Sequence, residues 1–168
     1  MDNNRRSRVV VGIDPTPSGM SALRRAVQEA RERDSTLVAV RSWLTQPHMY
    51  AVAPDLREVD EADAREVVNT CFAETLGGFP ADVSVETVVL PDYPGPALVT
   101  LADRDDDLLV LGSGRRNRRG SGSRTVRYCT AWAACPVLVV PPPHLARAVS
   151  QRALLRQLRR EIDDLTHH

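Results

Sequence analysis

The pattern of apolar positions along the chain predicts five short strands separated by helices. Three of the apolar runs are almost unbroken, which is typical of parallel strands covered on both faces. The run at 83–90 alternates only at its start, so we expect it near an edge of the sheet. The strands are expected at residues 9–13, 37–42, 83–90, 107–111 and 136–140.

Between these runs, apolar residues recur at steps of three and four, the spacing of one helix face. The first predicted helix covers residues 18–33, with Ser18 as its N-cap because Pro15 and Pro17 disfavour an earlier regular helix. Further helices are expected over 59–76, ended by a Gly-Gly pair, over 94–102, and from about 123–125 to 134.

The alternation of strands and helices predicts an α/β domain with a mostly parallel sheet over residues 1–143. After three prolines, residues 144–168 form a separate segment that we expect to be an amphipathic helical extension. Its apolar seam is too short to be stable alone, so it packs on its own domain or on a partner, and both options stay open. The seam consists of Leu155, Leu158, Ile162 and Leu165.

Composition narrows the function classes. Basic and acidic residues number 22 each, so bulk attraction to nucleic acid or anionic lipid is not expected. All the basic residues are arginine, which excludes a lysine nucleophile, a Schiff base and a Walker-A lysine. No stretch approaches the roughly 20 apolar residues of a membrane span, and we expect a cytoplasmic protein. The three cysteines form no Cys-x-x-Cys pair, so they are expected to be reduced core residues.

The first candidate for chemistry is the turn after the first strand, which holds Asp14, Pro15 and Thr16. A carboxylate at the carboxyl end of a strand lies where open α/β sheets bind ligands. Asp14 either accepts hydrogen bonds from the base or ribose of a nucleotide, or only orders the turn by binding backbone amides.

The second candidate is a loop rich in glycine, serine and arginine between the fourth strand and the last core helix. Glycines allow backbone amides to face an anion, a helix N-terminus favours negative charge, and arginine grips phosphate oxygens. The same composition is also typical of a mobile, solvated loop. The candidate anion-binding residues are Gly112, Ser113, Gly114, Arg115, Gly122, Ser123, Arg124 and Thr125.

No catalytic constellation is visible in the chain. The sequence contains no Walker A, His-Glu-x-x-His or Cys-x-x-Cys motif, and Gly112-x-Gly114 lacks the third glycine of a dinucleotide fingerprint. Asp14 is the only visible candidate for a general base, so at most a weak hydrolase activity is expected and a catalytic role is left open. One short basic loop without interleaved aromatics also makes nucleic-acid binding an unfavoured reading.

Two stretches resemble the universal stress protein family. One is Val-Val-Val-Gly-Ile-Asp at 9–14 followed by Pro-x-Pro-Ser. The other joins Leu-Leu-Val-Leu-Gly-Ser at 108–113 to Cys-Pro-Val-Leu-Val-Val at 135–140. The resemblance covers about residues 8–141. It implies an open five-stranded parallel sheet of order 3-2-1-4-5 between helices, a Rossmann-like fold of the adenine nucleotide alpha hydrolase type, with the C-terminal helix as an addition.

The resemblance also implies a ligand and a dimer. In family members that bind ATP, the nucleotide lies against an aspartate like Asp14 and a valine of the second strand, for which Val38 or Val40 is the candidate. Glycines and a Ser or Thr hold the phosphates, and magnesium is left open as a companion ion. A homodimer would form through the last strand, that is, through Val137, Leu138, Val139 and Val140.

The glycine-rich loop departs from the family pattern. One residue instead of two separates Gly112 from Gly114, and seven instead of nine lie between Gly114 and Gly122. We expect a dimeric stress-response sensor or regulator that binds ATP or a related adenine nucleotide between Asp14 and this loop. The alternative is a nucleotide-free module that binds a protein partner through residues 115–124 and the C-terminal helix.

Overall fold

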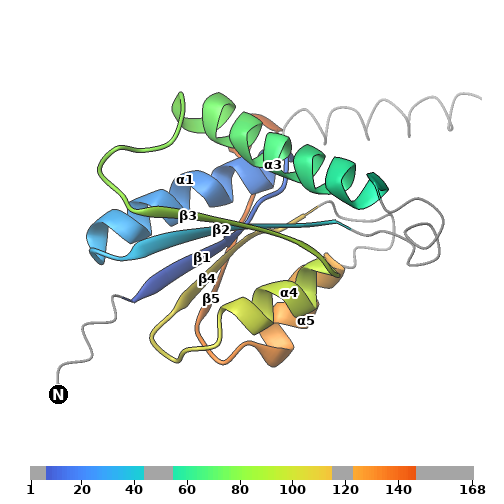
Figure 1. Cartoon of the computed structure of the whole chain (residues 1–168). Coiled ribbons are helices and arrows are strands. Elements are labelled where there is room, and N and C mark those ends of the chain that lie inside the picture. Colours follow the sequence, from blue (N-terminus) through green and yellow to red (C-terminus); the bar gives the residue numbers. More distant parts are fainter. Residues whose placement is uncertain (1–6, 44–54, 115–122, 147–168) are drawn as a thin grey trace, which may run out of the picture.

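A computed structural model describes residues 7–43, 55–114 and 123–146 of the chain (Figure 1). Strands and helices alternate along it as the apolar pattern predicts. In chain order the elements are β1 (Arg8–Gly12), α1 (Pro17–Glu32), β2 (Thr36–Trp43), α3 (Asp55–Leu76), β3 (Val85–Pro91), α4 (Pro94–Leu101), β4 (Leu108–Gly112), α5 (Arg124–Trp132) and β5 (Val137–Val140).

The five strands form one parallel sheet of order β3-β2-β1-β4-β5, which confirms the expected fold. Helices α1 and α3 cover one face of the sheet, and α4 and α5 cover the other (Figure 1). The run predicted to lie near an edge is β3, an edge strand of the sheet. Because β1 lies between β2 and β4, the chain winds in opposite directions from the centre of the sheet.

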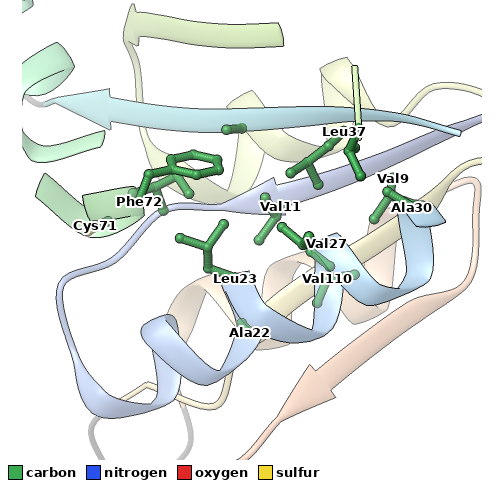
Figure 2. Close-up of a cluster of buried hydrophobic side chains, with 14 of the residues drawn as sticks. Val9, Val11, Ala22, Leu23, Val27, Ala30, Leu37, Cys71, Phe72 and Val110 are labelled. Atoms are coloured by element: carbon green, nitrogen blue, oxygen red, sulfur yellow. The ribbon is translucent and has the colours of Figure 1, made fainter. Parts of the chain in front are cut away.

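The larger apolar core fills the space between the sheet and α1 and α3 (Figure 2). Val9 and Val11 of β1 point into it, while Leu23 and Val27 of α1 meet them from the helix. Phe72 of α3 closes the far side and is fully buried. This face of β1 therefore packs against a buried apolar layer, which positions the carboxyl end of the strand.

A second apolar core lies between the sheet and α4 and α5, and it includes Val10, Leu98 and Leu109. Cys129 and Cys135 belong to this core, and Cys71 belongs to the first one. All three thiols are buried, which confirms that the cysteines serve as small core residues.

The predicted N-cap of α1 is wrong by two residues. Thr16, not Ser18, is the N-cap, because the Thr16 hydroxyl accepts a hydrogen bond from the Gly19 N–H at 3.2 Å. Pro17 occupies the first helical position, where the missing N–H leaves no bond unmade. The two prolines therefore do not prevent the helix from starting here, and the Ser18 hydroxyl is available for a contact outside the helix.

Helix α3 begins earlier than predicted, at Asp55, and ends where the Gly-Gly pair predicts. Gly77 has a φ of 78°, and its N–H donates to the Ala73 carbonyl, while the Gly78 N–H donates to the Phe72 carbonyl. These two bonds satisfy carbonyls of the last turn and stop the helix.

The amino ends of β1 and β4 are tied together by an ion pair. Arg8 donates from Nε to Oδ1 of Asp107 at 3.0 Å and from Nη2 to the Leu101 carbonyl at 3.0 Å. Asp107 is buried, and its side-chain hydrogen bond raises the pKa of the Arg8 guanidinium. This clamp lies at the opposite end of the sheet from the strand ends that bear the candidate site.

The seam of the predicted C-terminal extension falls in residues 147–168, outside the described residues. In the part of the chain that the structure describes, no helix is both long enough and apolar enough to cross a membrane.

Candidate functional site

A cleft of about 260 Å³ opens at the carboxyl ends of β1, β2 and β4. This is the point where the strand order reverses, and open α/β sheets bind ligands there. Its described lining residues are Gly12, Ile13, Asp14, Val40, Arg41, Ser42, Pro94, Leu98, Leu111, Gly112, Gly114, Ser123 and Thr125. The two segments that the sequence singles out therefore meet at one cleft, although 98 positions separate Asp14 from Gly112.

Asp14 is held in place by the turn that follows β1. The Thr16 hydroxyl donates to Oδ2 of Asp14 at 2.9 Å while it also caps α1. One hydroxyl thus fixes both the start of the helix and one carboxylate oxygen. Asp14 is partly buried at the wall of the cleft, and its Oδ1 accepts no hydrogen bond from the described residues.

Ser18 joins this turn to the turn after β4. Its hydroxyl oxygen accepts a hydrogen bond from the Gly114 N–H at 3.2 Å and lies 3.3 Å from the Thr16 hydroxyl oxygen. The Ser18 side chain is buried, so this bond is shielded from water. Asp14, Thr16, Ser18 and Gly114 therefore form one connected polar chain across the β1–β4 boundary.

Gly112 allows the two turns to approach so closely. A Cβ atom at this position would lie 2.7 Å from both the Gly19 nitrogen and the Ser18 carbonyl carbon, closer than real Cβ contacts. Gly19 is equally constrained, since its Cβ would lie 2.0 Å from the Asp14 carbonyl oxygen. Backbone packs directly on backbone here, and larger residues would push α1 away from β4.

The amino end of α5 forms the next wall of the cleft. Ser123 is the N-cap but makes no side-chain capping bond, and the first helical bond is from the Arg127 N–H to the Ser123 carbonyl. The N–H groups of the first turn thus lack intrahelical acceptors, as at every helix start, and Thr125 lines the cleft beside them. Gly114, with a φ of 69°, turns the end of β4 against Ser123.

The end of β2 contributes two residues that the sequence analysis missed, Arg41 and Ser42. Backbone groups of β2 alternate in direction: the N–H of Thr36 donates toward β1 and that of Leu37 toward β3. Even-numbered residues of β2 therefore turn their backbone groups toward β1. By this rule the N–H and C=O of Ser42 point at the gap beside Asp14.

The β1–β2 ladder stops just before Ser42. Its last rung runs from the Ile13 N–H to the Val40 carbonyl at 2.8 Å. The Ile13 carbonyl, which would accept the next rung, instead accepts a hydrogen bond from Nη1 of Arg41 at 3.1 Å. Pro15, which would donate the rung after that to the Ser42 carbonyl, has no N–H. A donor and an acceptor of Ser42 are thereby left at the cleft.

The other predicted residues lie in different places. Val40 lines the cleft, whereas Val38 is buried in the second core and does not line it. Pro15 is exposed on the turn, and Arg124 is exposed at the first position of α5. The Ser113 N–H donates to the Val140 carbonyl, so its backbone extends the β4–β5 ladder. Arg115 and Gly122 fall outside the described residues.

The lining combines an apolar floor with few charges. Val40, Leu98 and Leu111 supply the apolar surface, and Asp14 and Arg41 are the charged groups among the described lining residues. A carboxylate, free backbone groups and a helix N-terminus within one cleft suit a ligand that has an apolar ring, hydrogen-bond donors and an anionic end.

Comparison with known proteins places this cleft within a family-wide fold. The model of the universal stress protein family matches residues 5–141, which include every described lining residue. A universal stress protein of Mycobacterium tuberculosis is 32% identical over 126 residues, covering 70% of this chain and 39% of the relative. The chain thus spans 39% of the length of that curated relative.

Solved structures show the same fold. The universal stress protein UspA from Lactobacillus plantarum has a TM-score of 0.64 at 21% identity, over 82% of this chain and 99% of that protein. The crystal structure of a universal stress protein in complex with cAMP has a TM-score of 0.54 at 25% identity, over 83% of this chain and 100% of that protein.

Proposed function

The chain belongs to the universal stress protein family, and we propose that its cleft binds ATP or a related adenine nucleotide, so that the protein acts as a nucleotide-responsive regulator in the cytoplasm. The observation that carries this proposal is the convergence of Asp14, the backbone of Ser42 and the amino end of α5 on one cleft. A similar protein of the family has been crystallised with cAMP, which supports an adenine nucleotide as the ligand class.

The base would lie at the β2 side of the cleft. Val40 and Leu98 offer apolar surface for the ring, and Pro94 closes this side. The Ser42 N–H and C=O provide one donor and one acceptor, and the Watson–Crick edge of adenine offers an acceptor at N1 and a donor at the amino group. Matching of these groups selects for adenine, because unmatched buried polar groups cost free energy.

The phosphates would lie at the amino end of α5. The N–H groups of its first turn and the positive end of the helix dipole favour an anion there. The hydroxyls of Ser123 and Thr125 line the same part of the cleft and add donors. Asp14 lies between these two ends and would accept hydrogen bonds from the nucleoside.

Binding and sensing fit this lining better than hydrolysis does. Asp14 is the one carboxylate among the described lining residues, and no described histidine or cysteine lines the cleft. Asp14 is therefore the single candidate among the described lining residues for a general base that would activate a water molecule. If magnesium accompanies the phosphates, phosphate oxygens and water would supply most of its ligands.

The edge strand β5 supports a homodimer as part of the proposal. The carbonyls of Pro136 and Val140 accept bonds from β4, so the backbone groups of Val137 and Val139 point away from the sheet. An unpaired edge of this kind is a template for another strand, and two copies would pair antiparallel about a twofold axis. Leu138 and Val140 pack on the first core, whereas Val139 is 36% exposed.

The alternative function, a nucleotide-free interaction module, rests on residues 115–124 and on the C-terminal segment. Of that loop only Ser123 and Arg124 are described, and no described contact favours a partner protein over a nucleotide.

Thermal unfolding with and without nucleotides tests the proposal. A ligand that binds only the folded state at a hundredfold excess over its dissociation constant stabilises it by about 2.7 kcal/mol. We expect AMP, ATP or cAMP to raise the unfolding temperature, and GTP to raise it less. An unchanged unfolding temperature with every adenine nucleotide at millimolar concentration would rule the proposal out.

A further inference from the structure

Arg41 lies where the hydrogen-bond ladder between β1 and β2 ends and the cleft begins. Its side chain alternates with Val40 along β2 and so projects from the face of the sheet that α1 and α3 cover. From there its guanidinium reaches back to the strand end, and Nη1 donates to the Ile13 carbonyl at 3.1 Å.

This hydrogen bond occupies the acceptor that regular pairing would assign to Ser42. In a parallel ladder, the Ile13 residue donates to Val40 and accepts from Ser42. The first of these bonds is present at 2.8 Å, whereas the Ile13 carbonyl accepts its described hydrogen bond from Arg41 and not from Ser42. Without the guanidinium, the Ile13 carbonyl would be free to take the Ser42 N–H and lengthen the ladder by one rung.

We propose that Arg41 is a positioning residue that keeps the Ser42 N–H out of the sheet and available to the ligand. The benefit of this arrangement for ligand binding rests on the proposed function, whereas the bond from Arg41 to the Ile13 carbonyl is present in the structure itself. By holding the Ile13 carbonyl, Arg41 also fixes the peptide that leads into Asp14. One side chain thus sets the positions of two ligand-facing groups, on β2 and on the following turn of β1.

Two conditions favour the arginine over a backbone rung. An arginine–carbonyl bond is charge-assisted and stronger than a neutral backbone bond. Pro15 provides no further N–H, so a ladder extended to Ser42 would gain one rung and then end. The exchange of one neutral bond for one charge-assisted bond therefore costs the fold little and leaves a recognition group at the cleft.

Amide hydrogen exchange of Ser42 in the ligand-free protein tests this directly. The variants are Arg41→Met, which removes all side-chain donors, and Arg41→Lys, which keeps a cationic donor group. Arg24→Met, at an exposed arginine of α1, is the matched control. In Arg41→Met we expect Ser42 exchange to slow by about tenfold as its N–H joins the ladder, since paired amides exchange only on opening.

Arg41→Lys and Arg24→Met should leave Ser42 exchange close to that of the unchanged protein, and exchange at Val10 in the core should be the same in all four proteins. Unchanged or faster exchange of Ser42 in Arg41→Met, with Val10 still protected, would overturn the proposal. If Arg41→Met does not fold, Arg41→Lys must still keep the Ser42 amide unprotected, and a protected Ser42 in that variant would overturn it as well.

Calorimetric titration with AMP supplies the second reading. Arg41→Met should bind AMP about tenfold more weakly, a difference of 1.4 kcal/mol, and should lose part of its preference for AMP over GMP. Equal affinity and equal preference in Arg41→Met would overturn the role of Arg41 in recognition. If the unchanged protein binds no nucleotide, the proposed function fails, whereas the exchange experiment still decides how Arg41 acts on Ser42.

Discussion

The backbone N–H of Gly114 donates a hydrogen bond of 3.2 Å to the side-chain oxygen of Ser18, although 96 positions separate the two residues. Ser18 lies in the first turn of α1 and Gly114 lies just after β4. The bond therefore joins the two halves of the sheet at the point where its strand order reverses. It brings the turn that holds Asp14 and the turn that holds Gly114 into one cleft, so their role in ligand binding can be tested together.

Replacement of Asp14 by asparagine should weaken nucleotide binding with little effect on the fold. The amide is nearly the same size and can still accept the bond from Thr16, but it loses the charge and an acceptor. Since hydrogen bonds to charged groups contribute about 1.5–3 kcal/mol, we expect a loss of affinity of at least about tenfold. Calorimetric titration measures it, with Asp92→Asn outside the lining as the control; equal affinities would exclude a role for the carboxylate.

Gly112→Ala should destabilise the protein by about 1–3 kcal/mol, because the new methyl group would overlap the backbone of α1. Gly12→Ala is the matched comparison, since its methyl group would meet only the movable ends of Leu98 and Leu111 at 3.2 Å. Urea unfolding gives both free energies. A cost at Gly112 no larger than the cost at Gly12 would contradict the close approach of the two turns.

Arg8→Met should lower the free energy of unfolding by about 3 kcal/mol. Asp107 is 1% exposed, and removal of the guanidinium would leave its buried carboxylate with only the Arg104 N–H as a described donor. Chemical unfolding at pH 7 measures the loss. The double variant Arg8→Met, Asp107→Asn should recover part of it; no recovery would show that packing of the arginine stem, not the ion pair, matters.

The free energy of unfolding should fall as the pH rises above the ordinary pKa of a thiol. Burial raises the pKa of Cys129 to about 11, whereas an exposed thiol has a pKa of about 8.5. The folded state therefore holds this proton where the unfolded state has lost it, so the free energy of unfolding declines between these two values. The chain has no lysine to titrate in this range. Cys129→Ala should show a shallower decline in urea unfolding from pH 8 to 11; an identical slope would contradict this assignment.

Val139→Asp should convert a dimer into a monomer without unfolding it. The side chain is 36% exposed on the edge strand, so a charge is tolerated in the monomer and is unfavourable between two paired edges. Light scattering after size-exclusion chromatography gives the mass. A monomeric unchanged protein, or a dimeric variant, would exclude pairing through β5.

Most of the fold follows from local sequence signals. Unbroken apolar runs such as 108–111 predict buried parallel strands, and the Gly77-Gly78 pair marks the end of α3. The predicted N-cap of α1 is wrong because Pro15 and Pro17 argue against an earlier helix, whereas Pro17 is compatible with the first helical position. Both Thr16 and Ser18 also have hydroxyls that can cap a helix. Only the positions of the neighbouring amides decide which hydroxyl caps the helix and which reaches Gly114.

The site is less predictable, because much of it is backbone. Asp14, Gly112 and Thr125 were found from residue type and topology. The sequence does not single out Ser42, because the contribution that we propose for it is a backbone N–H and C=O, a pair that every residue except proline carries. The only signals were Pro15, which lacks an N–H, and a charged Arg41 near the end of an apolar strand. Their meaning depends on strand register, which sequence spacing does not determine.

Titration of the isotope-labelled protein with AMP, followed by backbone amide NMR, tests the central claim most directly. We predict that the amide signals of Ser42, Gly114 and Thr125 shift together and saturate with one dissociation constant, while that of Gly78, at the end of α3, stays in place. Absence of any shift at millimolar AMP in a well-folded spectrum, or shifts confined to another surface, would contradict a nucleotide site at the meeting point of β1, β2 and β4.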